Sequence, residues 1–105
     1  MGRVMQAQWV SVPAATLTHV VTVPADHKYE LLSGQVSANP GTPDLRAFLL
    51  DNAGGFFFLS SDQAGTEYVG GGFDGPVVAY AGDVVYVYSL NGAGEAYLTY
   101  IDVTF

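Results

Sequence analysis

Two histidines, His19 and His27, are the only imidazoles in the chain and therefore the natural candidates for a general base. Nucleophilic catalysis needs a serine or threonine beside such a base, and no serine sits in a Gly-x-Ser-x-Gly elbow. We expect His19, in an apolar alternating stretch, to be a hydrogen-bonded core or interface residue, and His27 to be a solvated turn residue. We therefore assign no catalytic residue and predict that the protein is not an enzyme.

Carboxylates are the second source of chemistry. Hard cations take carboxylate and carbonyl oxygens from loops, and the candidate groups are Asp26 with His27, or Asp74 with Asp83 and Asp102. Their spacing matches no calcium loop, and Asp51, Asp74 and Asp83 stand in turn-like segments, where aspartate side chains bond to the backbone. Nothing selects a carboxylate pair for glycoside hydrolysis. We predict no metal site.

The run Gly70-Gly71-Gly72 is the only glycine-rich stretch that could suggest a phosphate cradle. P-loop and dinucleotide motifs require a helix after the glycines, and the following residues 73–76, Phe-Asp-Gly-Pro, cannot begin a convincing one. We expect a flexible loop here and no bound cofactor.

Aromatic side chains offer a different kind of site, because flat rings can stack on sugar faces. The candidates are Trp9, Tyr29, Tyr68, Phe73, Tyr80, Tyr86, Tyr88, Tyr97 and Tyr100. The core of a sandwich and contacts between subunits account for most of them. A sugar-binding surface stays open as an alternative.

Composition sets the class of protein. The 105 residues suit one domain, residues 1–105, because a single core serves up to about 250 residues. Only 12% of residues are charged, about half the usual 25%, while 50% are hydrophobic. We therefore expect some apolar side chains to be buried against other copies of the chain or against a partner. The alternative is a monomer whose uncharged surface consists of Thr, Ser and Gly. A net charge of −7 with three scattered bases argues against nucleic acid. No cysteine is present, and no apolar stretch suggests a signal peptide or membrane span, so we expect a soluble protein without membrane association.

The pattern of residues predicts strands rather than helices. Thirteen glycines and five prolines interrupt short β-branched and aromatic runs. The expected strands cover residues 4–12, 16–23, 29–38, 45–50, 56–60, 66–69, 76–80, 84–90 and 96–105. The turn at residues 51–55 predicts that its two flanking strands are antiparallel neighbours.

About eight or nine short strands with regular turns predict an all-β, two-sheet antiparallel sandwich, jelly-roll-like, with an immunoglobulin-like sandwich as the alternative. In residues 84–90 both faces are apolar, since Tyr86 and Tyr88 alternate with Val85 and Val87. This strand should be central or covered by a neighbouring subunit.

Several strand and turn segments together resemble small structural proteins of tailed-phage virions, especially capsid decoration and related head or tail accessory proteins. These segments are residues 21–25, 29–36, Arg46, 51–54, 75–78, 81–83 and 97–103. The likeness spans about residues 17–105. It departs at Asp26, where similar proteins tend to carry glycine after Pro-Ala.

The resemblance implies a non-enzymatic protein on the outer surface of a phage capsid, a symmetric homo-oligomer with a trimer favoured. Such a protein would bridge subunits of the major capsid protein or other virion proteins through many small contacts. Residues 1–12, outside the best resemblance, are either a first strand or an N-terminal docking arm that adds to a neighbour. We expect partner contacts at Trp9, Val10, Tyr86 and Tyr88. A carbohydrate- or receptor-binding module of a fibre or secreted protein is the alternative function.

Overall fold

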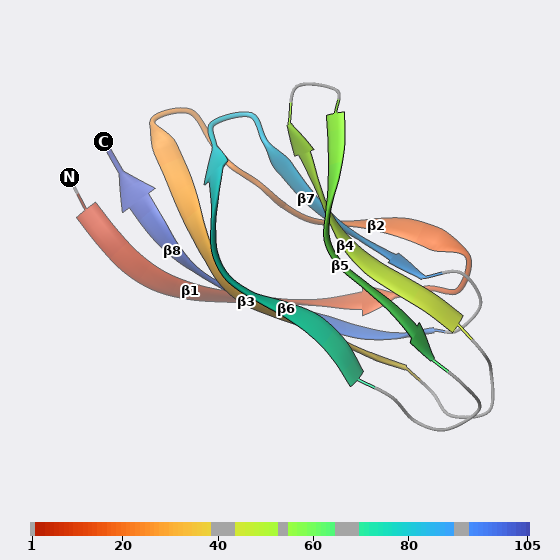
Figure 1. Ribbon diagram of the computed structural model, residues 1–105. Helices are drawn as coiled ribbons and strands as arrows, with labels where there is room; N and C mark the ends of the chain where they lie inside the picture. The colour runs from red at the N-terminus through yellow and green to blue at the C-terminus, as the bar shows by residue number, and fades with distance from the viewer. Residues whose placement is uncertain (1, 39–43, 53–54, 65–69, 90–92) are drawn as a thin grey trace.

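The computed structural model describes residues 2–38, 44–52, 55–64, 70–89 and 93–105, and these form two four-stranded antiparallel sheets (Figure 1). Sheet A has the order β1-β8-β3-β6, and sheet B has the order β2-β7-β4-β5. The strands are β1 (Gly2–Val12), β2 (Thr16–Thr22), β3 (His27–Ala38), β4 (Asp44–Asn52), β5 (Gly55–Ala64), β6 (Gly70–Tyr80), β7 (Val84–Ser89) and β8 (Gly94–Thr104). The sheets pack face to face, so the predicted all-β sandwich is confirmed.

The strand order is that of a jelly roll, because the first and last strands lie side by side and the chain alternates between sheets except at β4–β5. An immunoglobulin-like sandwich does not place its strands in this order. That alternative is therefore wrong. The predicted hairpin is confirmed, since β4 and β5 pair from Asn52 opposite Gly55 outward.

The core lies between the sheets and is made of alternate side chains from both. Its most deeply buried apolar members are Val12, Leu31, Phe48, Val85, Val87 and Leu98. β7 runs between β2 and β4, and its inward side chains at Val85 and Val87 are fully covered. The prediction of a central strand at this position is confirmed, and the reason is that β7 has a neighbour on each side.

A β-bulge in β2 changes the expected placement of His19. The register with β7 runs from His19 opposite Tyr86 to Val21 opposite Val85, which leaves Val20 as an extra residue. Val20, Val21 and Val23 are buried, whereas Leu17 and His19 point outward and are exposed. The expectation that His19 shares the apolar face is wrong, because the bulge shifts the two-residue repeat between His19 and Val21.

The glycine run at residues 70–72 is the start of β6 rather than a loop. Gly71 lies opposite Val36 and Gly72 opposite Gln35, so the backbone of β3 holds the glycines in the ladder. The expected ninth strand at residues 66–69 lies outside the described residues. Further along β6, a Cβ at Gly75 would lie 2.0 Å from the Leu31 carbonyl oxygen, so β3 and β6 approach too closely there for any side chain.

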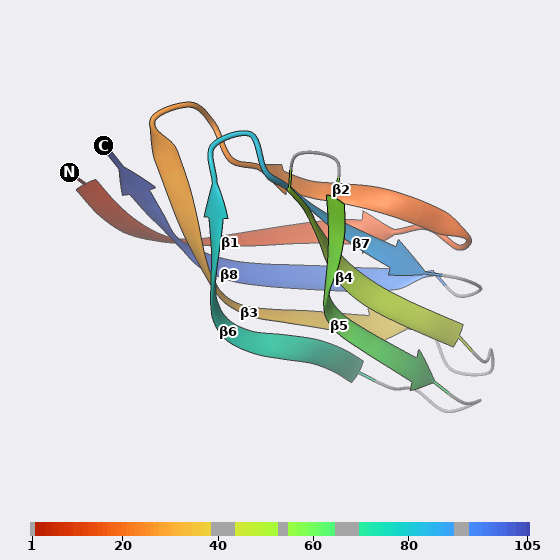
Figure 2. The same ribbon diagram turned by 45° about the horizontal axis from the view of Figure 1, so that its top comes forward.

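The β2–β3 and β6–β7 connections lie close to each other (Figure 2) and are linked by backbone hydrogen bonds. The Val23 N–H donates to the Asp83 carbonyl oxygen at 2.9 Å, and the Gly82 N–H donates to the Val23 carbonyl oxygen at 2.9 Å. Asp26 has φ 63, in the left-handed region that glycine adopts freely and aspartate tolerates. Asp26 thus has a backbone conformation that glycine adopts at no steric cost.

Candidate interaction surface

The groups considered for catalysis are distributed over the sandwich and serve local contacts. His19 Nε2 lies 2.7 Å from Thr22 Oγ1 on exposed β2, while His27 Nδ1 lies 2.6 Å from Asp102 Oδ1. His27 begins β3 and Asp102 lies near the end of β8, so their contact links two neighbouring strands. The expectation of a solvated turn position for His27 is wrong, because the residue is half-buried against that carboxylate.

Two of the carboxylates considered as cation ligands serve structural contacts instead. Asp83 is 5% exposed, and its Oδ2 accepts the Tyr80 N–H at 2.9 Å. Asp102 is engaged with His27. In the part of the chain that the structure describes, no three His, Cys, Asp or Glu side chains are grouped in a way that could hold a metal ion.

Two tyrosines stack beside Asp102 on the inner side of sheet A. The rings of Tyr29 and Tyr100 have centroids 4.4 Å apart and planes 27° apart. Burial, then the neighbouring Tyr29, raises the pKa of Tyr100 to about 12. Burial and the nearby Asp102 carboxylate also raise the pKa of Tyr29. Both rings are neutral packing groups at physiological pH.

The more distinctive surface is the edge strand β1. It pairs with β8 without interruption from Gly2 opposite Thr104 to Val12 opposite Gly94. Val4 is 55%, Met5 67% and Trp9 49% exposed. A long strand that exposes such apolar side chains at the border of a sheet is a ready template for association.

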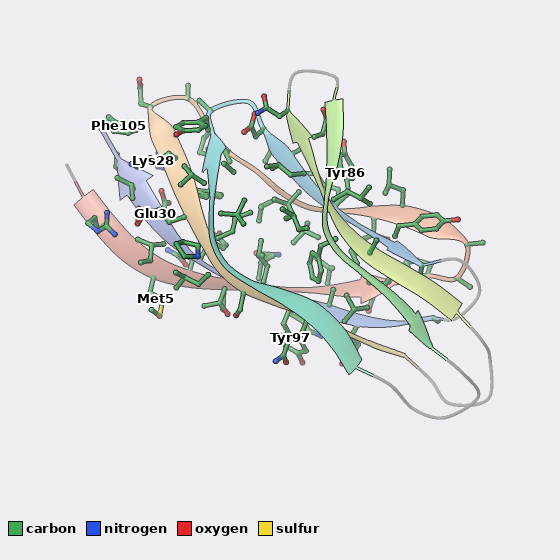
Figure 3. The ribbon with its side chains drawn as sticks, in the orientation of Figure 1. Met5, Lys28, Glu30, Tyr86, Tyr97 and Phe105 are labelled. Atoms are coloured by element: carbon green, nitrogen blue, oxygen red, sulfur yellow. The ribbon has the colours of Figure 1, made fainter. Side chains whose placement is uncertain are left out.

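The two faces of β1 differ in their surroundings. Met5 and Trp9 belong to the outer face of sheet A, and Figure 3 shows Met5 and Tyr97 projecting from that same side. Trp9 lies directly opposite Tyr97, which is itself 50% exposed and lies opposite Gln35 of β3. Val4, on the inner side, is still more than half exposed. We define Val4, Met5, Trp9 and Tyr97 as the β1 patch.

The four residues predicted to contact partners are not brought together. Trp9 is exposed on the outer face of sheet A, whereas Val10 points inward, is half-buried and packs against the core. Tyr86 and Tyr88 are half-buried on the outer face of sheet B. Sequence reasoning singled out Trp9 but missed Tyr97 as its partner, which only the β1–β8 register reveals. It also missed the exposure of Val4 and Met5 on the same strand.

Charged contacts surround one end of the patch. Arg3 of β1 forms an ion pair with Glu30 of β3 across β8. Lys28 Nζ lies 5.9 Å from the centroid of the Phe105 ring, within range of a cation–π contact. Both bases are thus held near the strand ends, and the middle of β1 from Val4 to Val10 carries no charge.

No protein-family model and no curated protein matches this chain. Among solved structures, it is similar to a chain of the Bacillus endospore appendages, a family of disulfide-linked pili. The TM-score is 0.55 with 16% sequence identity, covering 98% of this chain and 88% of that chain. This likeness shows a shared fold. In the described residues, no helix has the length and apolar character needed to cross a membrane.

Proposed function

We propose that this protein is a non-enzymatic structural subunit of a phage virion, which decorates or cements the capsid by bridging capsid subunits. The β1 patch carries the proposal. Its four members lie on one pair of hydrogen-bonded strands at the border of sheet A, and each is about half exposed or more. Exposed apolar side chains gathered along an open sheet edge mark contact sites between proteins.

The low charge of the chain supports the same function. Only 12% of residues are charged, and the buried centres of interfaces between proteins are depleted of charged residues. The resemblance of residues 17–105 to virion proteins is the reason for proposing a phage capsid as the assembly. The structural likeness to a pilus subunit is compatible with an assembly role for this fold.

Decoration works through repetition. Each small subunit makes a limited contact, and a shell presents that contact many times, so the total stabilisation grows with the number of occupied sites. The jelly roll suits this task because closely packed sheets present a rigid patch at little entropic cost on binding.

Add-back to depleted particles tests the proposal. Phage particles lacking this protein should bind the purified chain and then resist heating better than particles without it. Trp9→Ala should weaken binding, since exposed tryptophans are frequent anchors of interfaces. Leu17→Ala is the matched control, because Leu17 is similarly exposed (45% against 49%) but lies on β2 of the other sheet. Absence of binding by the unaltered chain would contradict decoration.

One observation favours the carbohydrate-binding alternative. Trp9 and Tyr97 form a pair of exposed rings, and Gln35 offers an amide on the next strand. Rings flanked by hydrogen-bonding groups are suited to a sugar face. Saccharide binding on a glycan array that is lost in Tyr97→Ala but retained in Tyr80→Ala, another exposed tyrosine (59%), would favour this function over decoration.

A further inference from the structure

The sandwich has four edge strands, and they differ in how well they are suited to accept another strand. The edges are β1 and β6 in sheet A and β2 and β5 in sheet B. Proteins commonly protect sheet edges with prolines, bulges or charges. An edge without such protection is therefore informative.

Three of the edges are irregular. β2 contains the bulge at Val20, and the pairing of β5 with β4 is shifted between Phe48 and Leu49. β6 carries Pro76, which has no N–H to donate, beside its own register shift against β3. β1 alone keeps an unbroken register with its neighbour, and it contains no proline.

The sequence of β1 is self-complementary about its midpoint, Ala7. The residues at equal distances before and after Ala7 in the sequence are Gln6 and Gln8, then Met5 and Trp9, then Val4 and Val10. Two antiparallel copies with Ala7 opposite Ala7 would therefore place like chemistry opposite like over residues 4–10, with Arg3 opposite Ser11 and Gly2 opposite Val12 beyond them. Because the strand runs from Gly2 to Val12, this register also pairs all eleven residues without overhang.

Charge favours the same approach. The chain has ten acidic residues and a net charge of −7, so two copies repel each other over most of their surfaces. β1 contains no acidic residue, and its one charge is Arg3. Among the four edge strands, β1 and β2 contain no acidic residue, and of these two only β1 keeps an unbroken register.

We propose that two copies of this chain associate through antiparallel β1 strands, with Ala7 opposite Ala7 on a two-fold axis. Sheet A then continues from one copy into the other. On the outer face Met5 contacts the second copy's Trp9, a favourable pairing of thioether and aromatic ring. On the inner side the exposed Val4 is covered by the second copy's Val10. This deepens the proposed structural role by naming one partner surface.

Single-cysteine variants test the register directly, because the natural chain contains no cysteine. Directly opposed residues of antiparallel strands have Cα atoms about 4.5–5.5 Å apart, within the range that a disulfide bridges. Ala7→Cys should therefore form a covalent dimer under mild oxidation. Ser11→Cys is the control on the same strand and face, since the two copies of residue 11 would lie roughly 27 Å apart. We expect crosslinking of Ala7→Cys to be at least about tenfold faster, because pairing raises the effective thiol concentration.

Charge variants give a second, independent readout. Ala7 is exposed and sits on the outer face, so either charge is compatible with the folded monomer. Ala7→Glu and Ala7→Lys should each be monomeric by light scattering, because like charges oppose each other on the axis. An equimolar mixture should restore the dimer mass.

Several results would overturn the pairing. These are a monomer mass for the unaltered chain up to millimolar concentration, a trimer mass that both charge variants keep, or equal crosslinking of the two cysteine variants. The pairing and the virion function fail separately. If the chain binds depleted particles but Ala7→Cys never crosslinks, the virion function stands and the β1 dimer is disproved. If the chain forms the β1 dimer but binds no particle, the dimer stands and the virion function is disproved.

Discussion

Asp83 Oδ2 accepts the backbone N–H of Tyr80 at 2.9 Å, and the Asp83 N–H donates in return to the Tyr80 carbonyl oxygen at 2.9 Å. The Asp83 carbonyl oxygen also accepts the Val23 N–H from the β2–β3 connection. One buried aspartate therefore closes the β6–β7 turn and helps to fasten it to the neighbouring turn. The sequence interpretation of Asp83 as a turn residue agrees with this geometry.

Removing that carboxylate should destabilise the fold. We expect Asp83→Ala to lower the free energy of unfolding by about 1.5–3 kcal/mol, the range for hydrogen bonds to charged groups. Chemical denaturation measures the change. Glu95→Ala, at an exposed acid, should stay within about 0.5 kcal/mol; equal losses in the two variants would mean that net charge, not the turn, sets the effect.

Phe48 should be the most sensitive large side chain in the core. It is fully buried at the centre of β4, and truncating a buried phenylalanine leaves a cavity as well as lost transfer free energy. Phe48→Ala should cost about 3–5 kcal/mol in urea denaturation. Phe105→Ala removes the same ring from a site that is 65% exposed, and a comparable loss there would contradict the assignment of the core.

The close approach of β6 to β3 predicts that Gly75 tolerates no side chain. Gly75→Ala should destabilise the protein by about 1–3 kcal/mol, because the new Cβ would meet backbone atoms that can move only with their strands. Gly2→Ala is the comparison, since its Cβ would find only ordinary contacts at 3.9 Å from Thr104. A thermal melt in which both variants match the parent would disprove the crowding at Gly75.

The tyrosine stack predicts a loss of stability in alkali. The folded-state pKa of Tyr100 is raised to about 12 from a usual value of 10.0, and the pKa of Tyr29 is raised as well. Between these pH values the unfolded chain releases protons that the folded chain retains, so the free energy of unfolding falls as pH rises. Below pH 10 these two groups should contribute no slope.

Denaturation at a series of pH values measures that slope. Tyr100→Phe should make the decline between about pH 10 and pH 12 shallower. The same alkaline slope in Tyr100→Phe as in the parent would show that the stacked pair does not control it.

Much of the fold could be predicted because its signals are local. Alternating β-branched residues and turn residues such as those at 51–55 mark strands and hairpins within a few positions. The bulge at Val20 could not be predicted, because the extra residue is a valine next to another valine and the sequence pattern looks the same with or without a bulge. The strand at Gly70–Gly72 was missed because its extended backbone is held by pairing with β3, more than thirty positions earlier in the chain.

The candidate interaction surface was harder to predict than the core. Trp9 could be singled out from its type, but its place beside an open sheet edge depends on the strand order. Tyr97 was one aromatic among many until the register set it opposite Trp9. Conversely, Val10 was expected to contact a partner. It points inward because successive side chains of a strand alternate between the two faces and Trp9 occupies the outer one.

If this chain is a structural component of a virion, purified particles must contain it in many copies, and quantifying their proteins decides the matter. In particles of a phage that encodes the chain, we predict a copy number comparable to that of the main shell protein, with the chain accessible on the outer surface. Particles that are complete and infectious but contain none of it, or only a trace, would contradict the proposed function.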